Sequence, residues 1–257
     1  MQREQFVAHA ALEDRHWWFT GRRDILRALL HAVAPPGRGI PVLDIGCGTG
    51  GNSGAFATEY DVMGTDPSAD GIEFARARFP GVQFAETSDP EAGRAHLAKR
   101  SGGVVLLTDV LEHVEGDHAL LEQAIAVVPS GGHLILTVPA DPTLWSKHDT
   151  DFGHFRRYEV DTFRALWREA PVEERLLSPF NTRLRPVIAF MRRVAPNNGN
   201  NLRMPAGPFN ALLHRMFAGE AASLTAALAT RDSRSLGELG TGFATRGVSL
   251  VAVLRKR

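Results

Sequence analysis

Cysteine is almost absent from this sequence of 257 residues: Cys47 stands alone, which excludes an internal disulfide and a zinc site built from cysteines. No apolar run approaches the roughly 20 residues that cross a membrane. The N-terminus, MQREQFVAHAALED, lacks the basic start and apolar core of a secretory leader. We therefore expect a cytoplasmic protein without stable membrane insertion.

An excess of charge of one sign is also missing. The 29 lysines and arginines balance 29 aspartates and glutamates, and no block of like charge appears, so nucleic-acid binding has no electrostatic support. We expect no nucleic-acid partner. The apolar content, 44%, is that of an ordinary soluble globule with a sizeable core.

What the chain does contain is an alternation of apolar runs and helical patterns. The first helical stripe lies in residues 22–34 and ends at PPGRG; it consists of Ile25, Leu26, Leu29, Leu30 and Val33. Strands are expected at 41–46, 61–66, 82–85, 103–108, 132–139, 172–178 and 248–254. This order predicts an α/β fold with a doubly wound, mostly parallel sheet.

We expect a single domain that spans residues 1–257. Its parts are an N-terminal helical lid (1–34), a ligand-binding core (40–178), a cap insertion (179–246) and the last strand (247–257). The cap contains the Asn-rich turn APNNGNN and one helix over 208–229. Monomer and homodimer both remain open.

A glycine motif, VLDIGCGTGG at 42–51, follows the first expected strand. Gly46, Gly48 and Gly50 let the backbone turn sharply and approach a ligand closely. Asp66 ends the next strand about 20 residues later, where its carboxylate can accept hydrogen bonds from both ribose hydroxyls of an adenosine ligand. The alternative is a glycine-rich turn followed by a solvated aspartate.

The loop reads DIGCGTG, and Asp44 just before it suits an aminoacyl sulfonium better than a pyrophosphate. With VVLLTDVLEHV and VPSGGHLILTVP, residues 40–178 closely resemble the class I S-adenosylmethionine-dependent methyltransferases. HWWFTGRR and LWSKHDTDFGHFRRY resemble a small-molecule subgroup of methyltransferase type 11/12. The resemblance implies S-adenosylmethionine as cofactor, a seven-stranded sheet with an antiparallel last strand, and a small-molecule substrate.

The resemblance also implies a role for individual residues. The methionine part of the cofactor would contact Asp44, Gly46, Gly48 and Gly50. Asp66 would bind the ribose, and Pro67 would flank the adenine. Thr108 and Asp109 would lie beside the sulfonium. The contact to the adenine amine stays open among Glu86, Ser88 and Asp89.

Asp109, Glu112 and His113 are spaced i, i+3, i+4 and would share one face if their segment is helical. Such a set can bind a divalent cation, as similar stretches do in some methyltransferases. The alternative is that Glu112 and His113 shape the floor of the pocket. We expect activity that requires no metal.

Residues 144–158 contain many titratable groups and should leave the sheet at its ligand-binding end. His148 and His154 are candidates for the general base, with Asp149 to orient one of them, and each could instead brace the loop. We favour His154 because Gly153 precedes it and the loop should turn back there. His113 is a further candidate.

The substrate should carry an anionic group, because Arg156 and Arg157 have a fork that suits carboxylates and phosphates. One of the pair could bridge to an acid of its own loop. Tyr158 belongs to the same site and is expected to brace it. Trp17 and Trp18, with Arg22, either form a lid over substrate or pack in the core.

The sequence therefore predicts methylation of a small molecule, on oxygen before nitrogen or carbon. The alternatives are a protein that binds S-adenosylmethionine without methylating, a metal-assisted O-methyltransferase, an NAD-dependent dehydrogenase and a nucleic-acid methyltransferase. The arginines of the cap permit contact with an anionic membrane surface or a lipid-linked substrate, although a solvated helix face is the simpler interpretation. These arginines are Arg183, Arg185, Arg192 and Arg193.

Overall fold

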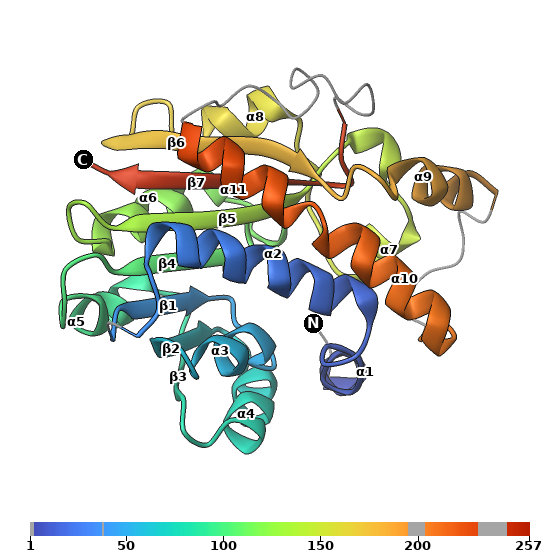
Figure 1. The fold of residues 1–257 in the computed structure, drawn as a ribbon. Coiled ribbons are helices and arrows are strands. Elements are labelled where there is room, and N and C mark those ends of the chain that lie inside the picture. Colours follow the sequence, from blue (N-terminus) through green and yellow to red (C-terminus); the bar gives the residue numbers. More distant parts are fainter. Residues whose placement is uncertain (1–2, 38, 195–203, 231–245) are drawn as a thin grey trace.

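A computed structural model describes residues 3–37, 39–194, 204–230 and 246–257. Seven strands form one sheet in the order β3-β2-β1-β4-β5-β7-β6 (Figure 1). Their bounds are β1 Pro41–Ile45, β2 Asp61–Asp66, β3 Gln83–Glu86, β4 Val104–Thr108, β5 His133–Pro139, β6 Val172–Phe180 and β7 Ser249–Lys256. Strands β1 to β5 pair in parallel and β7 runs antiparallel to β5 and β6, which confirms the predicted fold class.

The two central strands are buried along their whole length. Every residue of β1 and β4 is buried, and Val42 to Ile45 pair in register with Val104 to Leu107. Strands covered by helices on both faces are expected to be continuously apolar, as VVLLT is. Burial on both sides therefore gives these strands a run of apolar residues instead of an alternating pattern.

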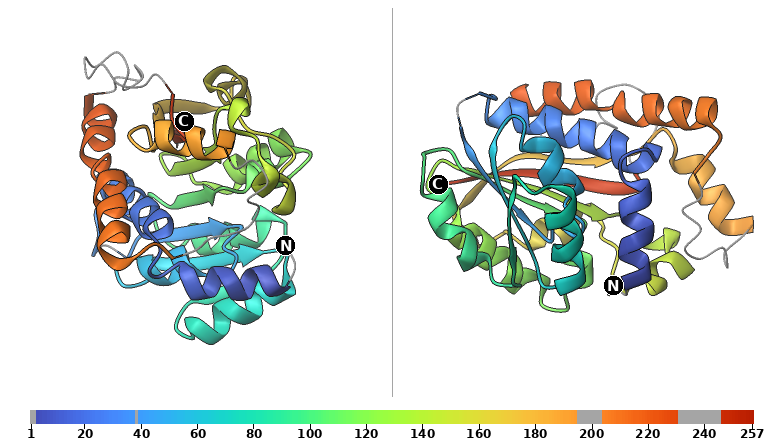
Figure 2. Two further views of the ribbon diagram at one scale, coloured as in Figure 1. Left: turned by 90° about the vertical axis from the view of Figure 1, so that its right-hand side faces the viewer. Right: turned by 90° about the horizontal axis from the view of Figure 1, so that it is seen from below.

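One face of the sheet is covered by α2 (Trp17–Val33), α10 (Gly207–Ala218) and α11 (Ala221–Thr230), as Figures 1 and 2 show. The predicted stripe of α2 is confirmed, since Ile25, Leu26, Leu29 and Leu30 are fully buried. The helix begins five residues earlier than expected, where the side chain of His16 accepts from the amide of Trp18. Much of the segment expected to form a lid, residues 17–33, is thus a helix that packs against the sheet.

The helix expected over 208–229 is two helices. The break falls at Gly219 and Glu220, where the Glu220 carboxylate accepts from the amides of Thr182 and Arg183. This contact joins the cap segment to the end of β6. The Asn-rich turn at 195–201 lies outside the described residues.

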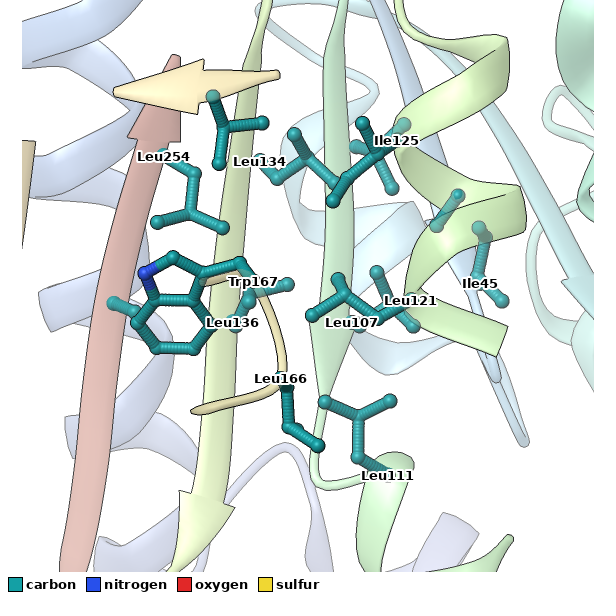
Figure 3. Close-up of a cluster of buried hydrophobic side chains, with 14 of the residues drawn as sticks. Ile45, Leu107, Leu111, Leu121, Ile125, Leu134, Leu136, Leu166, Trp167 and Leu254 are labelled. Atoms are coloured by element: carbon teal, nitrogen blue, oxygen red, sulfur yellow. The ribbon is translucent and has the colours of Figure 1, made fainter. Parts of the chain in front are cut away.

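The opposite face carries α6 (Asp117–Val127) and α8 (Val160–Ala165). In Figure 3, Leu121 and Ile125 of α6 meet Leu107 of β4, while Trp167 lies near Leu254 of β7. Each large apolar side chain buried in this way contributes about 1.5–3 kcal/mol to folding. Packing in this core fixes the positions of β4, β5 and β7 relative to one another.

The remaining elements are short or lie near the ends of the strands. The helices are α1 (Arg3–Leu12), α3 (Gly51–Phe56), α4 (Ala69–Arg78), α5 (Arg94–Leu97), α7 (Lys147–Asp151) and α9 (Arg185–Val194). The 3-10 turns are η1 (Pro90–Gly93), η2 (Leu111–His113) and η3 (Pro142–Leu144). Among the described residues, no helix has the length and apolar character that crossing a membrane requires.

Candidate active site

A cavity of about 740 Å³ opens at the carboxyl ends of the parallel strands, beside the point where the strand order reverses between β1 and β4. Open α/β sheets bind ligands at this switch point. The residues predicted for the site that line the cavity are Trp17, Trp18, Arg22, Gly46, Gly48, Asp66, Pro67, Thr108, Asp109, His113, His148, His154 and Arg157.

The three glycines of the loop after β1 have positive φ but differ in their surroundings. A Cβ on Gly46 would meet the Val110 side chain at 2.5 Å, whereas at Gly48 nothing lies within 4 Å. Gly48 therefore offers its open side to a ligand. Gly50 precedes α3 and contacts the Phe84 ring, outside the cavity, so its freedom serves the turn.

Asp66 ties the end of β2 to this loop. Its carboxylate accepts from the amide of Gly48 at 2.9 Å and from the amide of Ser68 at 2.8 Å. Burial raises the pKa of Asp66, and these two donors counteract it. The side chain is thus fixed on the cavity wall with lone pairs left for ribose hydroxyls.

Asp44 lies beneath the cavity lining and is fully buried. One carboxylate oxygen accepts from the Ser53 hydroxyl at 2.6 Å, and the other has no hydrogen-bond partner among the described residues. Burial raises the pKa of Asp44 to about 6. An unpartnered buried acceptor costs free energy, so this oxygen fits an added donor such as the ammonium of an aminoacyl ligand.

Thr108 and Asp109 continue the wall at the end of β4. The Thr108 hydroxyl accepts from the Asn52 side chain at 3.1 Å, and Asp109 accepts from Thr137 at 3.0 Å. Arg22 forms an ion pair with Asp109, so its guanidinium is directed to this carboxylate. Arg22 accordingly joins α2 to the site and fixes Asp109.

Asp109, Glu112 and His113 do not share a helical face, because their segment does not form an α-helix. Asp109 has φ 57, in the left-handed region, and precedes the 3-10 turn that contains the other two. Instead, Glu112 and His113 gather with His154, and one ligand atom from each lies within 4.8 Å of the others. One carboxylate and two imidazoles could hold a transition metal or shape a polar pocket.

Glu112 is the unusual member of this cluster. It is 1% exposed, and neither carboxylate oxygen has a partner among the described residues. Burial raises the pKa of Glu112 to about 8, so the side chain is a neutral acid at pH 7. It can then donate a hydrogen bond toward the cavity.

We predict that Glu112→Gln stabilises the protein at high pH. Between the ordinary pKa near 4.5 and about 8, the folded chain binds one more proton than the unfolded chain, so stability falls as the pH rises through this window. Without this group, the free energy of unfolding at pH 8 should exceed the wild-type value by on the order of 2–4 kcal/mol, and the gain should shrink toward pH 5. Chemical denaturation at several pH values measures it.

The control is Glu115→Gln, which changes an exposed glutamate three residues away. It should leave the pH dependence as in the wild type. A gain in Glu112→Gln that is the same at pH 5 and pH 8 would contradict the assignment.

The Asp149 carboxylate accepts several of the hydrogen bonds that hold the loop after β5 together. It is fully buried and accepts from His154 Nδ1 at 3.0 Å, from Arg157 Nε at 2.8 Å and from the Ser146 amide at 2.9 Å. Burial alone would raise the pKa of Asp149, but the bond from His154 and the Arg157 guanidinium hold it well below the usual range. Asp149 therefore stays ionised and orients His154.

The three candidate bases line the cavity but differ in their surroundings. Burial lowers the pKa of His113 to about 4 and that of His148 to about 4, so both are neutral and weakly basic at pH 7. His154 is the one held by a carboxylate, through Nδ1, which leaves Nε2 to accept a proton. The geometry favours His154 as the base.

Two expected substrate contacts lie elsewhere. Arg156 pairs with Asp117 at 2.6 Å, and the Tyr158 hydroxyl donates to the same carboxylate at 2.7 Å. Neither residue lines the cavity, because both anchor the loop to the start of α6. Arg157 does line it while bound to Asp149, which is the bridge within the loop that the sequence left open.

Trp17 and Trp18 pack against α10 and also reach the cavity. Trp18 stacks on Phe217 of α10 with ring centroids 5.3 Å apart, and Trp17 meets the same ring edge-on at 5.9 Å. Both also border the cavity. The candidates for the adenine contact, Glu86, Ser88 and Asp89, are not among the lining residues.

Several residues that line the cavity were not predicted for this site from the sequence. His9 of α1 lies between the rings of Phe19 and Phe152, at 5.4 and 5.3 Å. Glu13 accepts from the Thr49 hydroxyl at 2.7 Å and so joins α1 to the glycine loop. Arg192 of α9 also lines the cavity. A polar residue on an isolated helix has no motif that would direct it to a site.

Known proteins similar to this chain agree with the geometry. A family model described as a methyltransferase domain matches residues 17–174. Trans-aconitate 2-methyltransferase of Rhodopseudomonas palustris (strain HaA2) is 32% identical over 111 residues; the match covers 42% of this chain and only 40% of that protein.

Solved structures share the fold at low sequence identity. Phosphoethanolamine N-methyltransferase 2 of Haemonchus contortus aligns with a TM-score of 0.53 at 15% identity, over 90% of this chain and 52% of that chain. A SAM-dependent methyltransferase from Archaeoglobus fulgidus aligns at 0.51 and 14% identity, over 91% and 94%. At such identity the likeness is one of fold.

Proposed function

Since this chain belongs to the methyltransferase domain family, we propose that it is an S-adenosylmethionine-dependent methyltransferase whose acceptor is a small molecule with an anionic group, methylated on oxygen. The observation that carries the proposal is the His154–Asp149 pair on the cavity wall, with two arginines beside the same carboxylate. Bound S-adenosylmethionine supplies a methyl group on a sulfonium, an intrinsically reactive donor. The protein then has to position the acceptor and remove its proton.

The glycine-loop side of the cavity suits the cofactor. The open side of Gly48, the fixed carboxylate of Asp66 and the unpartnered oxygen of Asp44 offer backbone approach, hydroxyl acceptors and an ammonium partner. Thr108 and Asp109 would lie between this side and the acceptor. This arrangement supports the assignment that the sequence suggested for these five residues.

The proton would pass from the acceptor hydroxyl to His154 Nε2. Asp149 holds the imidazole through Nδ1 and stabilises the imidazolium that forms. The neutral rings of His113 and His148 border the same space and can accept hydrogen bonds from the acceptor without competing strongly for its proton.

The anionic group of the acceptor would meet Arg192. Asp149 lies 2.7 Å from Arg157 and 3.7 Å from Arg192, so two guanidiniums share one carboxylate and positive charge remains unbalanced. Burial lowers the pKa of Arg192 to about 10, which leaves it charged at neutral pH. The R. palustris relative is named for trans-aconitate, a carboxylate, which is the class that such a site favours.

We predict that Arg192→Met raises KM for carboxylate acceptors by roughly tenfold or more with a smaller effect on kcat, because a charge-assisted contact made in the bound state is lost. Arg193→Met, one residue along the same helix and exposed, is the matched control. The measurement is S-adenosylhomocysteine formation with carboxylates and with their amides. Equal KM values for acids in wild type and Arg192→Met would contradict the role of Arg192.

Chelation distinguishes this mechanism from a metal-assisted one at Glu112, His113 and His154. With a His154–Asp149 base, turnover should survive exhaustive removal of metal ions. Loss of turnover that magnesium or zinc restores would favour the metal-assisted alternative. A protein that binds the cofactor without methylating would release no S-adenosylhomocysteine with any acceptor.

A further inference from the structure

The helix α9 presents an apolar stripe to solvent. Val187, Phe190, Met191 and Val194 are 55%, 65%, 61% and 63% exposed, and their i, i+3, i+4, i+7 spacing places them on one face. No residue of α9 is buried. In a globular protein such a stripe normally faces the core, so its exposure here indicates a surface that binds something.

Positive charge accompanies the stripe. From Arg175 to Gly219 the sequence contains seven arginines and no aspartate or glutamate, although the whole chain has net charge zero. Arg183 and Arg193 are exposed and have no carboxylate within ion-pair distance in the described part of the chain. Arg183 and Arg193 therefore carry uncompensated positive charge near the apolar stripe, whereas Arg185 and Arg192 pair with Asp141 and Asp149.

The stripe also lies beside the mouth of the cavity. Figure 1 and both views of Figure 2 place α9 and the first turn of α10 at the end of the molecule where β1 to β5 terminate. Ile188 and Arg192 of α9 line the cavity, while the stripe residues do not. The start of α10 adds Phe209 and Leu212, which are 54% and 52% exposed.

We propose that the stripe of α9 and the start of α10 form an interfacial surface that docks the mouth of the cavity on an anionic lipid bilayer. The apolar side chains would enter the boundary between headgroups and acyl chains, with Arg183 and Arg193 at the lipid phosphates. Ten helical residues span about 15 Å, which suits a helix that lies in the plane of the membrane. The proposal rests on this surface and is independent of the acceptor.

The charge of the α9 surface favours an anionic bilayer over a second copy of this chain as its binding partner. A symmetric contact through α9 would bring two cationic, acid-free surfaces together, which is unfavourable. An anionic bilayer complements both properties of the surface, because each basic residue near it adds electrostatic attraction to the burial of the apolar side chains.

The test is sedimentation with vesicles of phosphatidylglycerol and with vesicles of phosphatidylcholine. The wild-type protein should bind the anionic vesicles, less so as the salt concentration rises, and should bind the neutral ones weakly. The double variant Phe190→Ser, Met191→Ser should bind at least tenfold more weakly, since it removes two large apolar side chains that would be buried in the bilayer. Arg193→Glu should weaken binding to anionic vesicles only.

The matched control is Val7→Ser, which changes an apolar side chain 51% exposed on α1. It should bind vesicles as the wild type does. Equal binding by wild type and the double variant, or no preference for anionic lipid, would overturn the proposal. A concentration-dependent dimer in analytical ultracentrifugation that the double variant abolishes would also overturn it and identify a homodimer interface.

Discussion

Replacement of His154 by alanine should lower turnover by roughly 10²-fold or more and leave the affinity for S-adenosylmethionine near the wild-type value. Among the three candidate bases, His154 is the one whose ring nitrogen is held by the ionised Asp149, at 3.0 Å. Its loss removes the proton acceptor while the residues assigned to the cofactor, Gly48 and Asp66, keep their contacts. Steady-state kinetics and calorimetry separate the two effects.

The comparison variants are His148→Ala and Asp149→Asn. His148 lines the same cavity but has a pKa lowered by burial to about 4, so its loss should affect turnover less. Asp149→Asn should reduce turnover by disturbing the orientation and charge of His154. Near-normal turnover in His154→Ala would move the proton transfer to His113 or to the acceptor's own ionisation.

Asp66→Ala should weaken binding of S-adenosylmethionine by about 10²-fold, since two hydrogen bonds to a charged carboxylate are worth about 1.5–3 kcal/mol each and other contacts partly compensate. The change also removes the acceptor for the amides of Gly48 and Ser68, which shape the loop that faces the ligand. Calorimetric titration with the cofactor and with its demethylated product measures the loss.

Glu86→Ala is the matched control for Asp66. Glu86 is the partner of Asp66 in the parallel register of β2 and β3 and ends its own strand, but it does not line the cavity. Its substitution should leave cofactor affinity unchanged. If Asp66→Ala binds the cofactor as tightly as the wild type, Asp66 has no part in holding the ribose.

The sheet and the glycine loop could be predicted from the sequence because their signals are local. Apolar runs such as VVLLT report burial on both faces, and the glycines of DIGCGTG occupy positive φ, which few other residues adopt. The order of the motifs then predicted at which end of the sheet the ligand-binding cavity opens. All seven expected strands are present, with ends shifted by at most two residues.

Pairings between distant segments could not be predicted in this way. Arg156 looked like a substrate contact and Tyr158 like a brace of the charged loop, but the partner that both bind, Asp117, lies 39 and 41 residues away in the chain. Nothing in the local spacing encodes that partner. The spacing of Asp109 from Glu112 likewise suggested a helical face that the positive φ of Asp109 prevents.

Methyl transfer to a small acceptor is tested most directly by a screen with S-adenosylmethionine labelled on its methyl group. Purified protein is incubated with the labelled cofactor and a metabolite extract, and both S-adenosylhomocysteine and labelled metabolites are followed by mass spectrometry. We predict one labelled anionic metabolite, formed in step with S-adenosylhomocysteine and lost in His154→Ala. Tight binding of the cofactor with no labelled product from any fraction would show that the protein does not transfer the methyl group to a small acceptor.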